Sequence, residues 1–179
     1  MVEGWFFHPS SLRICSFNQG PYGKFMARKI ILGIGNLLNR DEGVGIHAIR
    51  ALQQKHASGD LEIIDGGTLG LNLLPLVEES SHLLVLDAID AHKAPGALIE
   101  LPRQQVPLFS NIKMSQHQLS FQEVLGLAQV RGHLPPHLTL IGIQPADLEI
   151  GVDLSPTVAN VLPRLVARAE EIAQEWEDA

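Results

Sequence analysis

The sequence predicts an α/β fold, a three-layer sandwich in which a mostly parallel five-stranded sheet has helices on both faces. Three observations support this. Short, nearly continuous aliphatic runs recur along the chain, as expected of strands that are buried on both faces. Stretches with helical periodicity separate most of these runs. The chain has 179 residues, 45% of them hydrophobic, which suffices for one domain with a substantial core.

Five segments have the composition of buried strands. They are residues 29–34 (KIILGI), 61–64 (LEII), 83–86 (LLVL), 97–101 (ALIEL) and 138–143 (LTLIGI). The fourth segment follows the third after a loop too short to hold a crossover helix, which leaves room for one antiparallel strand. The remaining connections are long enough for right-handed crossovers between parallel strands.

Helices are expected between the strands. After the first strand, apolar side chains recur from Val44 to Leu52 with a period of about 3.6 residues, and Asp41 stands where an N-cap is expected. A shorter helix is predicted over residues 71–79, provided that Pro75 lies in its first turn.

Two further helices follow in the second half of the chain. Ser115 and Gln118 have the spacing of a capping box, which predicts a helix over residues 116–130. Ser155 and Pro156 open the C-terminal helix as N-cap and first helical residue.

The first 25 residues are interpreted as an appendage. Residues 1–25 have neither helical nor alternating periodicity, and we expect them to be poorly ordered. Gly, Pro, Asn and Gln interrupt their apolar stretches, which argues against a secretory signal. Residues 26–179 are predicted to form the one functional domain.

Charge and composition restrict the partners. The formal net charge is -7 and charged residues make up 18%, so no basic surface for nucleic acid or an anionic membrane is expected. No apolar stretch approaches the roughly 20 residues that cross a bilayer. The single cysteine, Cys15, excludes an internal disulfide and a thiolate metal cage, and it favours a reducing, cytoplasmic setting.

Polar residues follow the carboxyl ends of the predicted strands, where ligands bind in open α/β sheets. Glu42 lies after the first strand, Asp87 ends the third, and His117 opens a helix. Only the fold can bring residues so far apart in the chain together. Two carboxylates and one imidazole suit Ni, Fe, Zn or Mn and leave coordination positions open.

Each of these residues also has a purely structural explanation. Glu42 in a first helical turn is favoured by the helix dipole. Asp87 after a strand is a common turn or cap residue. A lone histidine such as His117 is more often simply solvated. Residues 65–68 (DGGT) are expected to form a turn, with contact to substrate as the less favoured alternative.

Other types of site have less support. Gly33 and Gly35 suggest a dinucleotide-binding loop, but Leu38 occupies the place of the third glycine and two acidic residues follow where phosphate would bind. No Gly-x-Ser-x-Gly or His-Glu-x-x-His motif occurs, and Cys15 lies in the appendage.

Six motifs occur in the order of one known family. GIGN (33–36), DEGVG (41–45), DGGT (65–68), LDAID (86–90), SQHQLSFQEVL (115–125) and LIGIQP (140–145) resemble those of the hydrogenase maturation proteases, endopeptidases that process nickel-iron hydrogenase large subunits. The resemblance runs from about residue 26 through the last helix. It implies that Glu42, Asp87 and His117 bind metal, the same three residues that the strand ends indicate.

The resemblance also implies an activity. A C-terminal extension would be removed from the large-subunit precursor after nickel insertion. The substrate would supply the nickel, and the protease would recognise it with a set of ligands that leaves coordination positions open. We expect Glu42, Asp87 and His117 to act mainly by positioning the substrate through the metal. Nickel as Lewis acid, or Glu42 or Asp87 as general base, remain alternatives for the cleavage itself. A non-enzymatic nickel carrier is the alternative function, and a dinucleotide-binding module ranks last.

Overall fold

The computed structural model describes residues 28–55, 61–108 and 121–177. The predicted appendage, residues 1–25, lies outside them, as do His117 and the expected capping box. Within the described residues, no helix is long and apolar enough to span a membrane.

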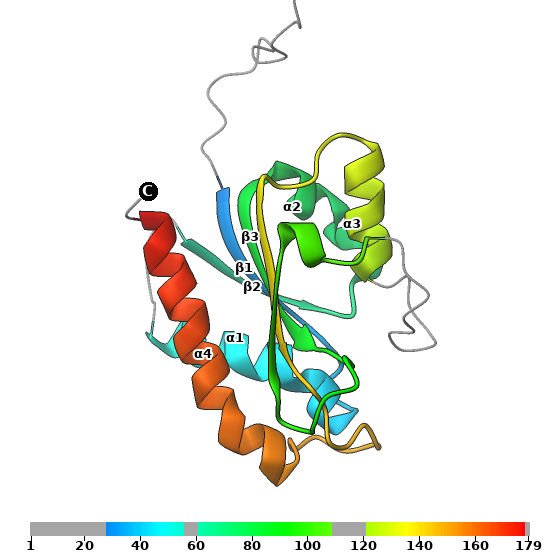
Figure 1. The fold of residues 1–179 in the computed structure, drawn as a ribbon, viewed down its shortest axis with the longest axis vertical. Helices are drawn as coiled ribbons and strands as arrows, with labels where there is room; N and C mark the ends of the chain where they lie inside the picture. Colours follow the sequence, from blue (N-terminus) through cyan, green and yellow to red (C-terminus); the bar gives the residue numbers. More distant parts are fainter. Residues whose placement is uncertain (1–27, 56–60, 109–120, 178–179) are drawn as a thin grey trace, which may run out of the picture.

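One five-stranded sheet forms the middle layer (Figure 1). Its strands are β1 (Arg28–Ile34), β2 (Leu61–Gly67), β3 (Ser80–Ala88), β4 (Leu98–Pro102) and β5 (His137–Ile143). The order across the sheet is β2-β1-β3-β5-β4. All neighbours are parallel except β4 and β5, which are antiparallel. The predicted fold class, the five strands and the antiparallel strand are therefore confirmed.

Helices cover both faces of the sheet (Figure 1). The α-helices are α1 (Val44–Lys55), α2 (Leu74–Glu79), α3 (Phe121–Val130) and α4 (Pro156–Glu177). Three short 3₁₀ helices accompany them: η1 (Arg40–Gly43), η2 (Gly70–Leu73) and η3 (Arg103–Gln105). The helices α1 and α4 pack on one face, and α2 and α3 pack on the other.

Alternation along the central strands divides the core into two layers. Against α1 and α4 the sheet presents Ile31, Leu84, Leu86, Ile141 and Ile143. Against α2 and α3 it presents Ile30, Leu32, Leu83, Val85, Leu138 and Leu140. Each strand is thus apolar on both faces, which explains why the strands appear in the sequence as continuous aliphatic runs.

Close packing at the start of α1 fixes the edge where β1 and β3 end. A Cβ atom on Gly45 would lie 2.2 Å from the carbonyl oxygen of Leu86 and 2.3 Å from that of Ile34. On Gly33 it would lie 2.3 Å from a side-chain carbon of Ile49. These glycines therefore serve helix-to-strand packing, and their presence is explained without a dinucleotide.

Three local predictions need comment. Asp41 as N-cap of α1 is wrong, because it lies inside η1 and its carboxylate bonds to a distant loop. The turn predicted at residues 65–68 is wrong in its bounds, since β2 continues through Gly67, which pairs with Ile34. The helix predicted over residues 71–79 divides into η2 and α2, with Pro75 in the first turn of α2 as required.

Candidate functional site

Asp87 is the second-last residue of β3, the middle strand of the sheet, and only 4% of it is exposed. The amide of Ala88 donates a hydrogen bond to its Oδ1 over 2.8 Å. Burial raises the pKa of Asp87 to about 8, the bond from the Ala88 amide opposes this rise, and the charge of Glu42 adds to it. Near neutral pH this carboxyl group is therefore poised between its two protonation states.

Glu42 lies half-buried in η1, above the end of β1. Its amide donates to the carbonyl of Asn39 over 3.0 Å. Its own carbonyl oxygen would lie 1.9 Å from a Cβ atom on Gly35, whose φ of +140° also favours glycine. This close approach fixes the backbone that carries the Glu42 carboxylate.

The fold brings two of the three predicted site residues together. Glu42 comes from the segment after β1, Asp87 from the end of the adjacent strand β3, and the charge of one acts on the pKa of the other. His117 lies outside the described residues, within which no three His, Cys, Asp or Glu side chains group as metal ligands.

The chemistry of this pair suits a divalent cation. The two carboxylates repel each other when both are charged, which is one cause of the raised pKa of Asp87. A cation bound between them would favour the charged form of each. Oxygen ligands of this type, together with an imidazole nitrogen, bind borderline metals such as nickel.

Asp41 has a role that sequence reasoning missed. It is fully buried, and its carboxylate accepts four hydrogen bonds, of 2.7 to 2.9 Å, from the loop between β5 and α4. The donors are the amides of Ala146, Asp147 and Ser155 and the Ser155 hydroxyl. Ser155 Oγ also accepts from the amide of Val158, which confirms it as the N-cap of α4. Asp41 thus ties the Glu42 segment to this loop.

Gln144, in the LIGIQP motif, similarly orders the loop that follows Asp87. Its side-chain oxygen accepts from the amides of Ala91 and Lys93 over 2.9 and 3.1 Å. Its side-chain nitrogen donates to Asp90 over 3.1 Å. The motif itself was the only sequence signal for this residue, because its partners are more than 50 positions away.

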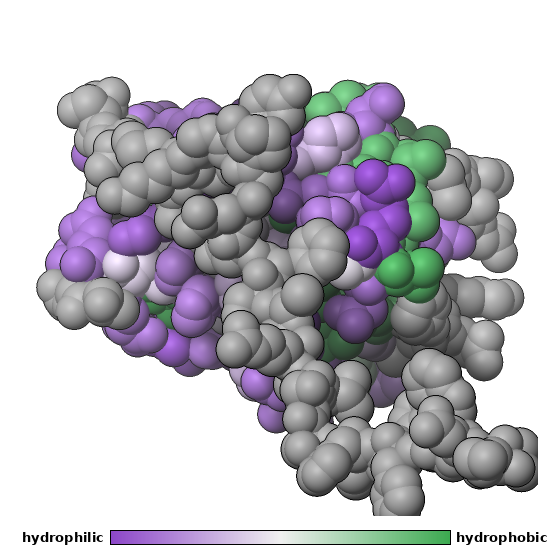
Figure 2. Space-filling model, turned by 90° about the horizontal axis from the view of Figure 1, so that it is seen from above, coloured by the Kyte–Doolittle hydropathy of each residue, from purple (hydrophilic) through white to green (hydrophobic). Residues whose placement is uncertain are grey.

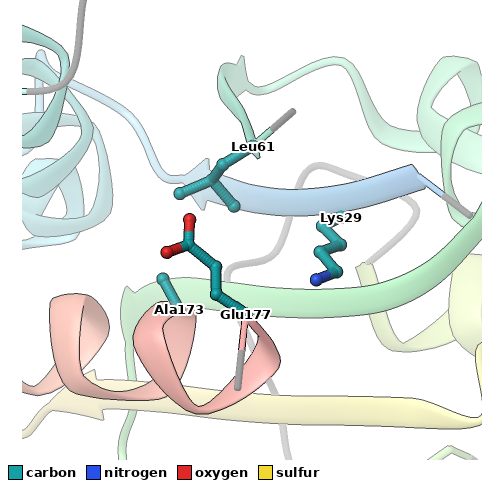
Figure 3. A pocket seen from close by; sticks show the side chains of 4 residues that line it. All are labelled: Lys29, Leu61, Ala173 and Glu177. Atoms are coloured by element: carbon teal, nitrogen blue, oxygen red, sulfur yellow. The ribbon is translucent and has the colours of Figure 1, made fainter. Parts of the chain in front are cut away.

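The opposite edge of the sheet holds a small cavity of about 280 Å³, lined by Lys29, Leu61, Ala173 and Glu177 (Figure 3). It lies where β1 and β2 begin and α4 ends, far from Asp87 at the other end of the strands. Figure 2 views this edge, where the described surface is mainly hydrophilic, with hydrophobic residues gathered on the side of α2 and α3. The cavity is therefore separate from the Glu42 and Asp87 pair.

Sequence comparisons find known proteins that are similar to most of the chain. A family model described as hydrogenase maturation protease matches residues 46–172. The hydrogenase expression/formation protein HupD of Rhodobacter capsulatus is 41% identical over 152 residues, which cover 83% of this chain and 72% of that protein. The hydrogenase 2 maturation protease of Escherichia coli K12 is 41% identical over 137 residues, covering 75% and 84%.

Solved structures agree with the sequence comparisons. The hydrogenase maturating endopeptidase HybD from E. coli superposes with a TM-score of 0.75 and 35% identity, covering 83% of this chain and 93% of that one. The nickel-iron hydrogenase maturation protease HycI from Thermococcus kodakarensis has a TM-score of 0.67 at 22% identity, with the same coverage, and shows the fold alone.

Proposed function

The chain belongs to the hydrogenase maturation protease family and is a peptidase, and we propose that it removes the C-terminal extension from a nickel-iron hydrogenase large-subunit precursor after nickel insertion. The observation that carries this proposal is the pairing of Glu42 with Asp87 at the carboxyl edge of a fold shared with these endopeptidases. We propose that this edge receives the precursor. A cytoplasmic location remains a prediction from the single cysteine.

Nickel is proposed to arrive as part of the substrate. Glu42 and Asp87 would supply oxygen ligands to it, and His117 would supply nitrogen, on the strength of its motif. Three ligands leave positions that donors from the precursor can fill. The proximity of the two carboxylates supports this proposal, because a site with two negative charges gains most from a bound cation.

The residues of the chain would then act by positioning. Asp87 releases its remaining proton when it contacts the cation, and the amide of Ala88 keeps its carboxylate directed. The backbone packing at Gly35 holds Glu42 in place. A precursor held at these two points presents its scissile bond in one orientation, whereas a precursor without nickel is not held at them.

Hydrolysis itself needs a water molecule at the scissile carbonyl. Water adds to the carbonyl carbon, the carbon–nitrogen bond breaks, and the amine leaves with a proton. The attacking water supplies both the hydroxyl that joins the carbonyl carbon and the proton that leaves with the amine. Bound nickel would supply charge stabilisation at this edge.

The test compares two forms of one precursor. Purified protein is incubated with nickel-loaded and nickel-free large-subunit precursor, and release of the extension is followed by mass spectrometry. We expect cleavage of the loaded form alone. Equal cleavage of both forms would contradict the proposed dependence of cleavage on nickel in the precursor. Stoichiometric nickel binding without cleavage of either form would instead support the nickel-carrier function.

A further inference from the structure

Large aliphatic side chains are exposed on two loops at the same edge as Glu42 and Asp87. One loop follows β1 and the other joins β5 to α4. Between 52% and 89% of each of these residues is exposed. We call the set the apolar rim: Leu38, Leu148, Ile150 and Val152.

Backbone hydrogen bonds join the two loops of the apolar rim. The amide of Gly151 donates to the carbonyl of Leu38, and the amide of Arg40 donates to the carbonyl of Gly151, both over 2.9 Å. Nε of Arg40 lies 3.3 Å from a carboxylate oxygen of Asp147, an ion pair without hydrogen-bond geometry. The four bonds to Asp41 anchor the base of the second loop. The rim is therefore presented in one defined arrangement.

This arrangement has the properties of a protein-binding surface. The core is complete without the rim, so exposing these side chains to water gives the fold nothing. A loop backbone that is already held by hydrogen bonds loses little entropy when a partner covers the loop. Exposed acidic residues, Glu149 and Asp153, alternate with the aliphatic ones, which favours a partner with basic side chains.

The position of the rim identifies what covers it. Leu38 precedes Glu42 by four residues in the same segment. The second loop leaves β5, the neighbour of strand β3, which carries Asp87. The loops after β1, β3 and β5 meet at the lower end of the sheet in Figure 1. A polypeptide that brings a metal to Glu42 and Asp87 approaches this end of the sheet, where the rim also lies.

We propose that the apolar rim docks the precursor polypeptide beside its metal centre, through aliphatic side chains accompanied by Lys or Arg. This inference rests on the proposed function, but it concerns binding and not cleavage. Docking through the rim needs no nickel, so nickel-free precursor should bind to it without being cut.

The experiment uses one rim substitution with a matched control. Val152→Ser removes an aliphatic side chain from the rim, and Val130→Ser makes the same change at the exposed end of α3, near the opposite edge where β5 begins. Ile150→Ser tests the most exposed rim residue. For each variant, binding of nickel-free precursor is measured by biolayer interferometry, and kcat and KM are measured with nickel-loaded precursor.

We expect Val152→Ser and Ile150→Ser each to weaken precursor binding and raise KM by about tenfold, with kcat unchanged and Val130→Ser like the parent. Raising the salt concentration should weaken binding further. Normal binding and KM in both rim variants would overturn the docking surface while leaving the proposed function intact. The docking surface would also be overturned if a rim substitution separated a dimer of this chain and had no effect on precursor binding. Rim-dependent binding by a parent protein that cuts nothing would support docking and overturn the proteolytic function.

Discussion

Two aspartates are buried at the same edge of the sheet, yet their surroundings differ. Asp41 accepts four hydrogen bonds, three from amides and one from a hydroxyl. Among the described residues, Asp87 accepts one, from the amide of Ala88, and it faces the charge of Glu42. The protein satisfies the first carboxylate with four hydrogen bonds, whereas the second has one hydrogen bond within the described residues and a like charge beside it. Asp41 therefore builds the edge, and Asp87 is available to a ligand.

The largest effect on stability is expected from Asp41→Ala. The substitution removes the acceptor of four hydrogen bonds, of which the two from Ser155 are buried and the two from the Ala146 and Asp147 amides are partly buried. We expect a loss of about 3 to 5 kcal/mol in the free energy of unfolding. Urea denaturation measures it. Asp41→Asn, which keeps one acceptor oxygen, should lose less, and a loss below about 1 kcal/mol for Asp41→Ala would contradict the structural role.

Asp87→Asn should have the opposite effect on stability while abolishing processing. The folded pKa of about 8 lies above the ordinary value of 3.8, so the folded state holds a proton that the unfolded state releases. The contribution of Asp87 to the stability of the parent protein is therefore highest below about pH 4 and falls until about pH 8. The metal-free variant should match the parent near pH 4 and exceed it by a margin that grows as the pH rises to about 8.

Thermal melting at several pH values measures this difference. Glu42→Gln is the companion variant, because it removes the neighbouring charge and should make the stability of the protein fall less between pH 4 and pH 8. A difference in melting temperature between the parent and Asp87→Asn that stays constant across that range would show that the pKa of Asp87 is not raised in the folded protein.

A smaller effect is expected where backbone packing supports Glu42. Gly35→Ala places a Cβ atom 1.9 Å from the Glu42 carbonyl, at a φ of +140°. We expect a loss of about 2 to 3 kcal/mol in stability and a reduced processing rate. Gly132→Ala is the matched control, since its φ is +77° but no atom lies within 4 Å, and it should cost about 1 kcal/mol with normal processing. Equal costs for the two variants would exclude the close approach.

The smallest effect is expected at the opposite edge. Arg28 forms hydrogen bonds of 2.7 and 2.8 Å with Glu62, and both side chains are partly exposed. Arg28→Ala should therefore lower stability by about 1 kcal/mol or less, and its effect should diminish in high salt. Processing should be unchanged. A loss of processing in this variant would mean that the two edges are coupled.

The sheet was predictable because its signals are local. The central strands β1, β3 and β5 are buried on both faces and mostly aliphatic, so their segments stand out from the chain around them. The edge strands β2 and β4 are shorter aliphatic runs that each include a glutamate. The antiparallel strand β4 was predictable from the length of one loop. The extension of β2 to Gly67 was not, because pairing with Ile34 overrides the turn preference of two glycines.

The site was predictable in part. The position of Glu42 and Asp87 at neighbouring strand ends follows from the parallel order of β1 and β3. The role of Asp41 did not follow, since its partners lie 105 to 114 residues away and an acidic residue before a helix is equally expected of an N-cap. The apolar rim was also missed, because the sequence does not show whether an aliphatic residue in a loop is buried or exposed. His117 remains a prediction.

The coordination of nickel in the bound precursor shows whether Glu42 and Asp87 bind the metal of the substrate. X-ray absorption spectra at the nickel edge would be recorded for loaded precursor alone, and for precursor frozen with the protein before cleavage. The account predicts additional oxygen or nitrogen neighbours at about 2.0 to 2.2 Å in the complex, and their reduction with Glu42→Gln. An unchanged nickel environment in a complex that goes on to be cleaved would contradict it.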